Sequence, residues 1–267
     1  LKLKERVKAG RYKISEGMNN RELTALLRSG RQTPLRFTFN NVRTVYELAG
    51  VMGENFEADS VSVLKEMFKQ SLLDSLKLDS LTIATVFIPN TYEMYWNTRP
   101  EAIIRRMVKE HAAFWNDERR AKAAALKLSP TEVSILASIV EQETRMNDEK
   151  PLIAGVYLNR LQKGWKLEAD PTLVYASGDF GIRRVLNIHK EIDSPFNTYK
   201  YSGLPPGPIC IPSIASIDGV LNRTEHEYLF FCAKEDMSGY HAFAKSYEDH
   251  LLNARRFQKE LSRRGIR

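Results

Sequence analysis

The sequence SPTEVSILASIVEQE occupies residues 129–143 and carries the clearest helix signal in the chain. Ser129 is a favoured N-cap residue, Pro130 suits the first helical position, and Glu132 follows the cap at the spacing of a capping box. Apolar residues then recur at helical intervals, at Val133, Leu136, Ile139 and Val140. These features predict an amphipathic helix that starts after Ser129 and reaches Glu143.

The two glutamates near the end of this predicted helix lie on different faces. Glu143 follows apolar residues by three, four and seven positions, which places it on the apolar stripe. Glu141 instead shares its face with Ser134 and Ser138. Burial and the negative end of the helix dipole both disfavour an ionised carboxylate, so we expect a raised pKa at Glu143, as a general acid requires. The alternative is a frayed helix end at which Glu143 is solvated or paired with an arginine.

Composition restricts the class of protein. Of the 267 residues, 43% are hydrophobic and 27% are charged, which is typical of a globular protein and excludes a disordered or collagen-like chain. Cys210 and Cys232 are too few for a disulfide scaffold, and the sequence leaves open whether they pair. The sequence shows no zinc-ligand spacing and no phosphate-binding glycine loop, so we expect neither metal nor cofactor. The net charge of +7 suits nucleic acid, an anionic membrane or an anionic polymer, but no nucleic-acid-binding module is recognisable.

Hydrophobic periodicity predicts a mixture of helices and short strands. Strands are expected at residues 10–14, 35–39 and 228–233. Further helices are expected from about Asn20 to Gly30, after Thr44, and at residues 100–115, 119–128, 150–161 and 247–264. Loops are expected at residues 170–172, 194–197 and 203–208, where proline and polar residues gather. The texture changes near residue 80, which gives a soft boundary between a small first module and a helix-rich second part.

The order of several short motifs along nearly the whole chain resembles one known family. LASIVEQET at residues 136–144 is similar to the signature helix of the MltG (YceG-like) family of endolytic murein transglycosylases. The similarity continues through VYLNRL at 156–161, residues 164–167, DPT at 170–172, NTY at 197–199, GLPPGPI at 203–209 and HAF at 241–243. Upstream, residues 87–92 resemble a Pro-Asp-Thr-Tyr segment of the family, and residues 10–30 resemble part of its LysM-like module.

This resemblance implies a fold class, a reaction and a set of site residues. It implies an α+β fold, with a small LysM-like α/β module at residues 1–80 and a helix-rich α+β catalytic domain at residues 81–267. The implied reaction cleaves β-1,4 bonds between N-acetylmuramic acid and N-acetylglucosamine within peptidoglycan strands and leaves 1,6-anhydro ends. The family's catalytic glutamate corresponds to Glu143, which would act first as acid and then as base. Residues expected to orient the sugar or the acid are Asn159, Asp170, Thr172, Asn197, Tyr199 and His241.

The resemblance also implies a location and partners. It implies a single-pass protein of the inner membrane whose catalytic domain lies in the periplasm. The membrane helix would precede Leu1, because the chain starts without Met and its apolar runs are shorter than the ~20 residues that span a bilayer. The implied partners are peptidoglycan glycan strands and, among proteins, peptidoglycan synthases.

Two rival functions remain open at this point. A hydrolytic muramidase would use Asp170 or another carboxylate to activate water, and a non-catalytic protein would bind peptidoglycan without cutting it. The sequence departs from the family pattern at Gln142, Glu168, Phe196 and Ser213. None of these departures removes Glu143, but they leave the details of sugar binding open.

Overall fold

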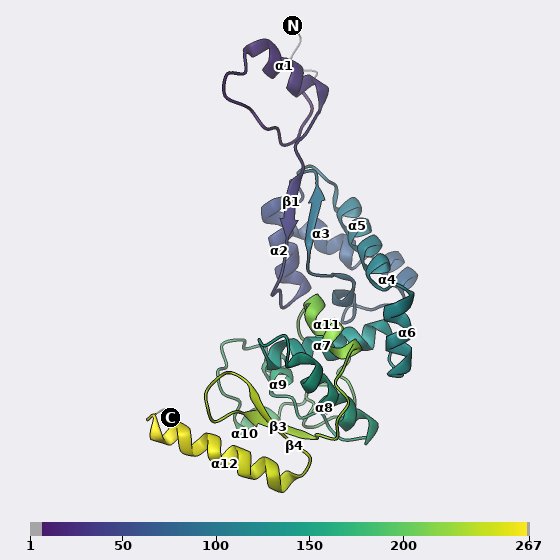
Figure 1. Cartoon of the computed structure of the whole chain (residues 1–267). Coiled ribbons are helices and arrows are strands. Elements are labelled where there is room, and N and C mark those ends of the chain that lie inside the picture. Colours follow the sequence, from purple (N-terminus) through teal and green to yellow (C-terminus); the bar gives the residue numbers. More distant parts are fainter. Residues whose placement is uncertain (1–6, 266–267) are drawn as a thin grey trace. The chain divides into compact units, whose positions relative to one another are not determined.

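The computed structural model describes residues 7–265, which form an α+β fold. The chain divides into two compact units, of which the first ends at His111 and the second begins at Ala112 (Figure 1). Over residues 7–265, each unit contains helices and one two-stranded antiparallel sheet. Within the described residues, no single helix is long and apolar enough to cross a membrane, and only the bent pair α6 (Asp117–Ala125) and α7 (Pro130–Glu143) passes by length and composition.

The first unit is built around a short antiparallel sheet. Strand β1 (Leu35–Thr38) pairs with β2 (Thr91–Met94), so that Leu35 lies opposite Met94 and Thr38 opposite Thr91. The helices of this unit are α1 (Asn20–Ser29), α2 (Val45–Asn55), α3 (Ser60–Met67), α4 (Gln70–Leu76), the 3₁₀ helix η1 (Ile83–Val86) and α5 (Pro100–Phe114), whose last residues continue into the second unit. The sheet joins residues far apart in sequence and buries alternate side chains, Leu35 and Phe37 among them.

Local capping signals explain where two of these helices begin or end, whereas the prediction of one strand is wrong. Asn19 and Glu22 form a capping box at the start of α1, and Gly30 ends it with a φ of 70°. Thr44 caps α2 by accepting a hydrogen bond from the backbone N–H of Glu47 at 3.1 Å. The predicted strand at residues 10–14 is not present, because a strand needs a partner and the sheet in this unit consists of β1 and β2.

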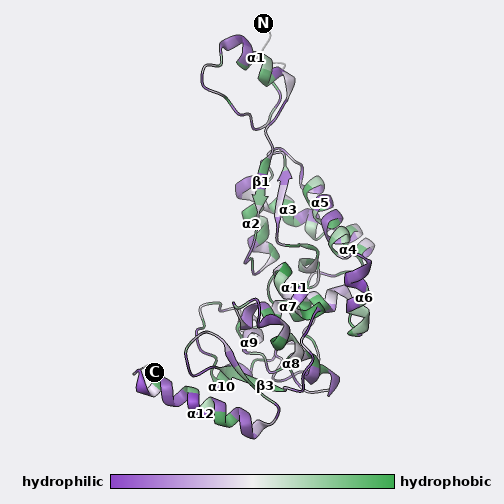
Figure 2. Cartoon of the chain, in the orientation of Figure 1, coloured by the Kyte–Doolittle hydropathy of each residue, from purple (hydrophilic) through white to green (hydrophobic). Residues whose placement is uncertain are grey.

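The second unit is centred on α7 (Pro130–Glu143). This helix packs against α8 (Lys150–Gln162) and α11 (Ile214–Leu221), and Figure 2 shows hydrophobic residues, in green, on α7 and α11. The other helices are α6 (Asp117–Ala125), α9 (Asp170–Ser177), α10 (Asn187–Lys190) and α12 (Tyr247–Arg263). Strands β3 (Phe230–Ala233) and β4 (His241–Ala244) form an antiparallel pair against which α12 packs.

The capping box that opens α7 is present as expected, but the helix is buried on both faces. Ser134 and Ser138 lie inside the protein, where the Oγ atom of Ser138 accepts a hydrogen bond from the backbone N–H of Ile209 at 2.9 Å. The polar face expected for these serines is therefore not a solvated one. The proline-rich segment 203–209 forms a loop, as predicted, and its end packs against α7 through this bond.

One feature of the organisation differs from the sequence expectations. Residues 170–172 begin helix α9 rather than a loop, because Pro171 occupies a position near the start of a helix, where its missing N–H costs nothing. The compact units divide between His111 and Ala112, and the boundary between modules at residue 80 stays a prediction. The pairing of β2 with β1 ties residues 91–94 to the first unit.

Candidate active site

The carboxyl group of Glu143 is held by a tyrosine from the neighbouring helix. Glu143 is the last residue of α7 and is half-buried. The hydroxyl group of Tyr157 on α8 donates a hydrogen bond to Oε1 of Glu143 at 2.5 Å. Tyr157 is itself only 1% exposed, and its ring packs edge-on against Phe231 of β3 with the ring centroids 5.8 Å apart. The carboxyl group therefore has a fixed position, rather than the solvated one of a frayed helix end.

The surroundings of Glu143 favour its protonated form. Burial is the largest cause and raises the pKa of Glu143 from an ordinary 4.5 to about 7, although the hydrogen bond from Tyr157 opposes this rise. The negative charge of Asp170 raises this pKa further, and the positive charge of Arg160 lowers it. Burial and the nearby Glu143 also raise the pKa of Tyr157 well above its ordinary range, so its hydroxyl group remains a donor.

Glu141, two residues earlier, has the opposite environment. Its Oε2 atom accepts hydrogen bonds from the hydroxyl groups of Ser213, at 2.5 Å, and Ser216, and it pairs with Nζ of Lys150 at 3.1 Å. Burial raises the pKa of Glu141, but these hydrogen bonds and the ammonium charge outweigh it and lower the pKa below its ordinary value. Glu141 is therefore an ionised structural carboxylate that joins α7 to α8 and α11.

A second carboxylate acts on Glu143 from the start of α9. Asp170 is exposed, and its Oδ1 atom accepts a hydrogen bond from the hydroxyl group of Tyr199 at 2.6 Å. The ammonium group of Lys190 lies 4.6 Å from the centroid of the Tyr199 ring, within the range of a cation–π contact. Burial, followed by the hydrogen bond to Asp170, raises the pKa of Tyr199 above its ordinary value. Of the predicted sugar-orienting residues, Asp170 and Tyr199 are thus brought together near Glu143.

Three other predicted residues use their side chains within the protein. Thr172 and Asn197 are fully buried: Thr172 contacts Thr198 at 2.8 Å between hydroxyl oxygens, and the amide of Asn197 donates to the carbonyl groups of Lys190 and Ile192. The amide of Asn159 donates to the carbonyl groups of His226 and Tyr228, at 2.8 and 3.0 Å. These side chains fix the loops around the site. Their predicted contact with sugar stays a prediction.

His241 takes part in a buried network with Glu149. Glu149 accepts hydrogen bonds from the backbone N–H of His241 at 2.7 Å and from the hydroxyl group of Thr144 at 3.1 Å. Its Oε2 atom also lies 2.7 Å from Nδ1 of His241. Because Thr144 directly follows Glu143, this network ties the end of α7 to β4.

Comparison with known proteins places the chain in a family. The model of the YceG-like family matches residues 1–256. The chain belongs to the YceG-like family. A protein of Bacillus subtilis (strain 168) named endolytic murein transglycosylase is 28% identical over 258 residues, with 91% of this chain and 71% of that protein covered. A protein of the same name from Streptococcus pneumoniae (strain ATCC BAA-255 / R6) is 29% identical, with 92% of this chain covered.

The family likeness extends to three dimensions. A crystal structure of a YceG-like protein from Listeria monocytogenes matches this chain with a TM-score of 0.71 and 28% identity, covering 92% of this chain and 84% of that one. The YceG-like chain spans 50% of the length of its Streptococcus relative.

Sequence reasoning missed three residues that shape the site of this YceG-like chain. Tyr157 and Arg160 lie within the VYLNRL motif. In both cases a polar group in an otherwise apolar helix is the sequence feature that could have indicated a site residue. Arg160 donates to the carbonyl groups of Leu229 and Leu167, at 2.7 and 2.5 Å, and thereby fixes the segments on either side of it. Nothing in the local sequence pairs Glu149 with His241, since 92 residues separate them.

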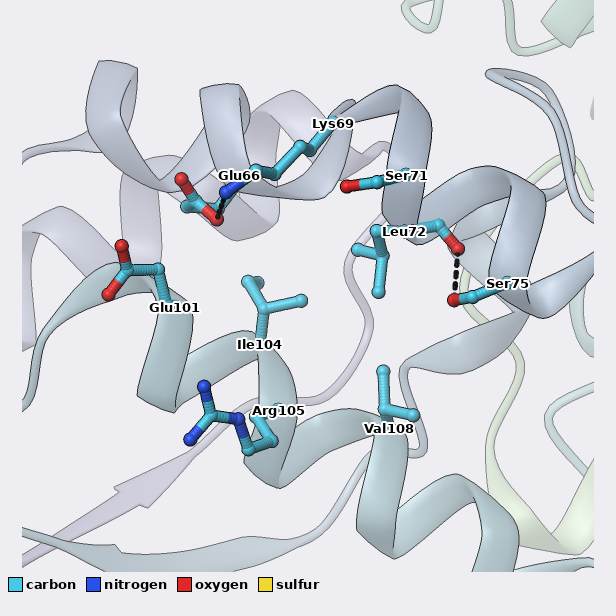
Figure 3. A pocket seen from close by; sticks show the side chains of 9 residues that line it. All are labelled: Glu66, Lys69, Ser71, Leu72, Ser75, Glu101, Ile104, Arg105 and Val108. Carbon is cyan, nitrogen blue, oxygen red and sulfur yellow. Dashed lines mark hydrogen bonds and ion pairs between the residues drawn. The ribbon is translucent and has the colours of Figure 1, made fainter.

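Outside the glutamate site, the first unit contains a pocket of about 390 Å³ between α3–α4 and α5 (Figure 3). Leu72, Ile104 and Val108 supply its apolar surface, and Lys69 and Glu66 at its edge pair at 3.3 Å. None of the predicted site residues lines this pocket.

Cys210 and Cys232 form no disulfide with each other. Across residues 7–265, no group of three His, Cys, Asp or Glu side chains is arranged to hold a metal ion.

Proposed function

We propose that this chain is a murein lytic transglycosylase that uses one carboxyl group twice. Glu143 first donates its proton to the glycosidic oxygen between N-acetylmuramic acid and N-acetylglucosamine, while the bond from C1 to that oxygen breaks and positive charge develops on the muramyl ring. The carboxylate of Glu143 then accepts the proton of the muramyl 6-hydroxyl group, whose oxygen attacks C1. The product is a 1,6-anhydro end, no water is consumed, and Glu143 is protonated again.

The observation that carries this proposal is the pKa of Glu143. A pKa raised to about 7 keeps the proton of Glu143 available near neutral pH, and the carboxylate left after its transfer can accept a proton again. The hydrogen bond from Tyr157 occupies Oε1 and leaves Oε2 as the atom that carries the reacting proton. The names of the Bacillus and Streptococcus relatives, endolytic murein transglycosylase, support the same reaction and an attack within strands.

Digestion of uncrosslinked glycan strands tests the proposal. The wild type should release fragments whose muramyl ends are lighter by one water than reducing ends, as mass spectrometry resolves. Glu143→Gln should bind strands and release nothing, because an amide has no acidic proton to donate. Glu143→Asp is the matched control, because it keeps a carboxyl group but moves that group away from the glycosidic oxygen by about the length of one carbon–carbon bond. Undiminished cleavage by Glu143→Gln would refute the role of Glu143.

A hydrolytic muramidase is the alternative that one specific observation favours. The carboxylate of Asp170 lies in the same site and is oriented by Tyr199. If Asp170 activated water against C1, the products would carry ordinary reducing ends. Asp170→Asn would then abolish cleavage, whereas the transglycosylase mechanism predicts continued formation of anhydro ends.

The location and the role of the first unit follow as part of the proposal. We propose a LysM-like wall-binding function for the first unit, an inner-membrane anchor that precedes Leu1, and a catalytic domain in the periplasm. Co-sedimentation of Glu143→Gln with purified murein tests wall binding, and fractionation of cells that carry the natural protein tests the location. Cross-linking in such cells tests whether peptidoglycan synthases are partners.

A further inference from the structure

An exposed apolar and basic segment adjoins the site. This segment, called the joining segment below, consists of residues 178–190: the loop that follows α9 and the short helix α10 (Figure 1). Within this joining segment, Phe180 is 45% exposed, Leu186 53% and Ile188 73%. Three large apolar side chains exposed within so short a stretch are more than a loop needs in order to connect two helices, and such a surface is typical of a binding site.

Most of the charged side chains of the joining segment are positive, and two of them are exposed to solvent. Arg183 and Arg184 are both exposed, and in the part of the chain that the structure describes neither forms an ion pair. The carboxylate of Asp179 is turned back on its own loop, where it accepts the backbone N–H of Gly181 at 2.9 Å. The segment therefore carries two exposed guanidinium groups close in sequence to exposed aliphatic side chains, a combination that suits a ligand with carboxylates and methyl groups.

Several contacts attach the joining segment to the site residues. The side-chain amide of the buried Asn197 donates to the carbonyl of Lys190 at 2.9 Å, and Lys190 in turn lies on the ring of Tyr199. Tyr199 donates to Asp170, whose charge acts on Glu143. At the other end, the ring of Phe180 lies 6.2 Å from that of Tyr175 on α9. These contacts attach one end of the joining segment to Tyr199, which bonds to Asp170, and the other end to α9, which begins at Asp170.

We propose that the joining segment binds the acidic peptide that murein carries on its muramyl residues. This inference rests on the proposed murein substrate. In a murein strand the lactyl carboxyl group is condensed with a short peptide, so the carboxylates and the alanine methyl groups lie in that peptide and the sugar backbone is neutral. Arg183 and Arg184 pair with the peptide carboxylates, and Leu186 and Ile188 contact its methyl groups. The segment therefore makes the enzyme prefer strands that still carry their peptides.

The experiment compares two substrates and two pairs of substitutions. The substrates are uncrosslinked strands with their peptides and the same strands after an amidase has removed the peptides. Arg183→Ala/Arg184→Ala removes the exposed cations of the segment. Arg255→Ala/Arg256→Ala removes another exposed adjacent pair, on α12, and is the matched control for net charge. Affinity is measured in the Glu143→Gln background, so that binding is read without cleavage, and circular dichroism checks that the variants fold.

We expect the segment variant to lose about tenfold in affinity for peptide-bearing strands and nothing for stripped strands, while the α12 variant binds both as the parent does. Equal losses on both substrates, or no loss on either, would overturn the inference. Loss of binding to vesicles of phosphatidylcholine and phosphatidylglycerol with unchanged strand binding would also overturn it and indicate a membrane surface. Failure of the proposed function is distinguishable, because it would appear as absent cleavage by the wild-type chain whatever the affinities are.

Discussion

Replacing Glu143 by glutamine should stabilise the protein at alkaline pH while it abolishes catalysis. The folded state holds the pKa of Glu143 at about 7 by burial, against an ordinary value of 4.5. Between these two values the folded state binds more protons than the unfolded state, so the wild type loses stability as the pH rises through this window. At about 1.4 kcal/mol for each pKa unit, the neutral glutamine avoids a penalty of about 3 kcal/mol at pH 8 but only about 1 kcal/mol at pH 5.

The assay is urea unfolding of both proteins from pH 5 to pH 8, with the free energy of unfolding compared at each pH. Glu141→Gln is the control on the same helix, and it should lower the free energy of unfolding where Glu143→Gln raises it. It leaves the ammonium group of Lys150, whose side chain is 4% exposed, without its carboxylate and should cost about 3–5 kcal/mol near neutral pH. Because the pKa of Glu141 is lowered, this contribution is present above the ordinary value and fades as the pH falls below it. If the free energies of unfolding of wild type and Glu143→Gln differed by the same amount at every pH, a raised pKa of Glu143 in the folded state would be refuted.

Three further substitutions test the surroundings of Glu143. Tyr157→Phe removes a hydrogen bond that lowers the pKa of Glu143, so the alkaline limb of the kcat/KM profile should move to higher pH while the rate falls about tenfold. Asp170→Asn removes a charge that raises this pKa, so the limb should move to lower pH; limbs that move in the same direction in both variants would contradict these assignments. Glu149→Gln should lower the stability by about 2–4 kcal/mol, because it weakens the buried link between the end of α7 and β4, and an unchanged melting temperature would argue against that link.

Helix starts and ends were predictable because the groups that cap them lie close in sequence. Ser129 and Glu132 satisfy the first N–H groups of α7, and Gly30 ends α1 in a left-handed conformation, whatever the rest of the fold does. The strand expected at residues 10–14 failed for the converse reason, since alternation of side chains does not supply a pairing partner. The sequence of Asp170-Pro171 does not distinguish a loop from a helix start, because proline suits both a turn and the first turn of a helix.

The sequence by itself determined the helix that carries Glu143, its place on the apolar stripe, and the order of motifs that indicates the YceG-like family. Only the tertiary structure decided which partners surround each of the two glutamates. Glu141 meets Lys150 and two serines, Ser213 and Ser216, whereas Glu143 meets the hydroxyl group of Tyr157 and no ammonium or guanidinium partner among the described ion pairs. The physical reason is that a carboxyl group's pKa depends on burial and on the charges and hydrogen-bond donors that folding brings near it, among them the hydroxyl group of Ser216, 75 residues from Glu141.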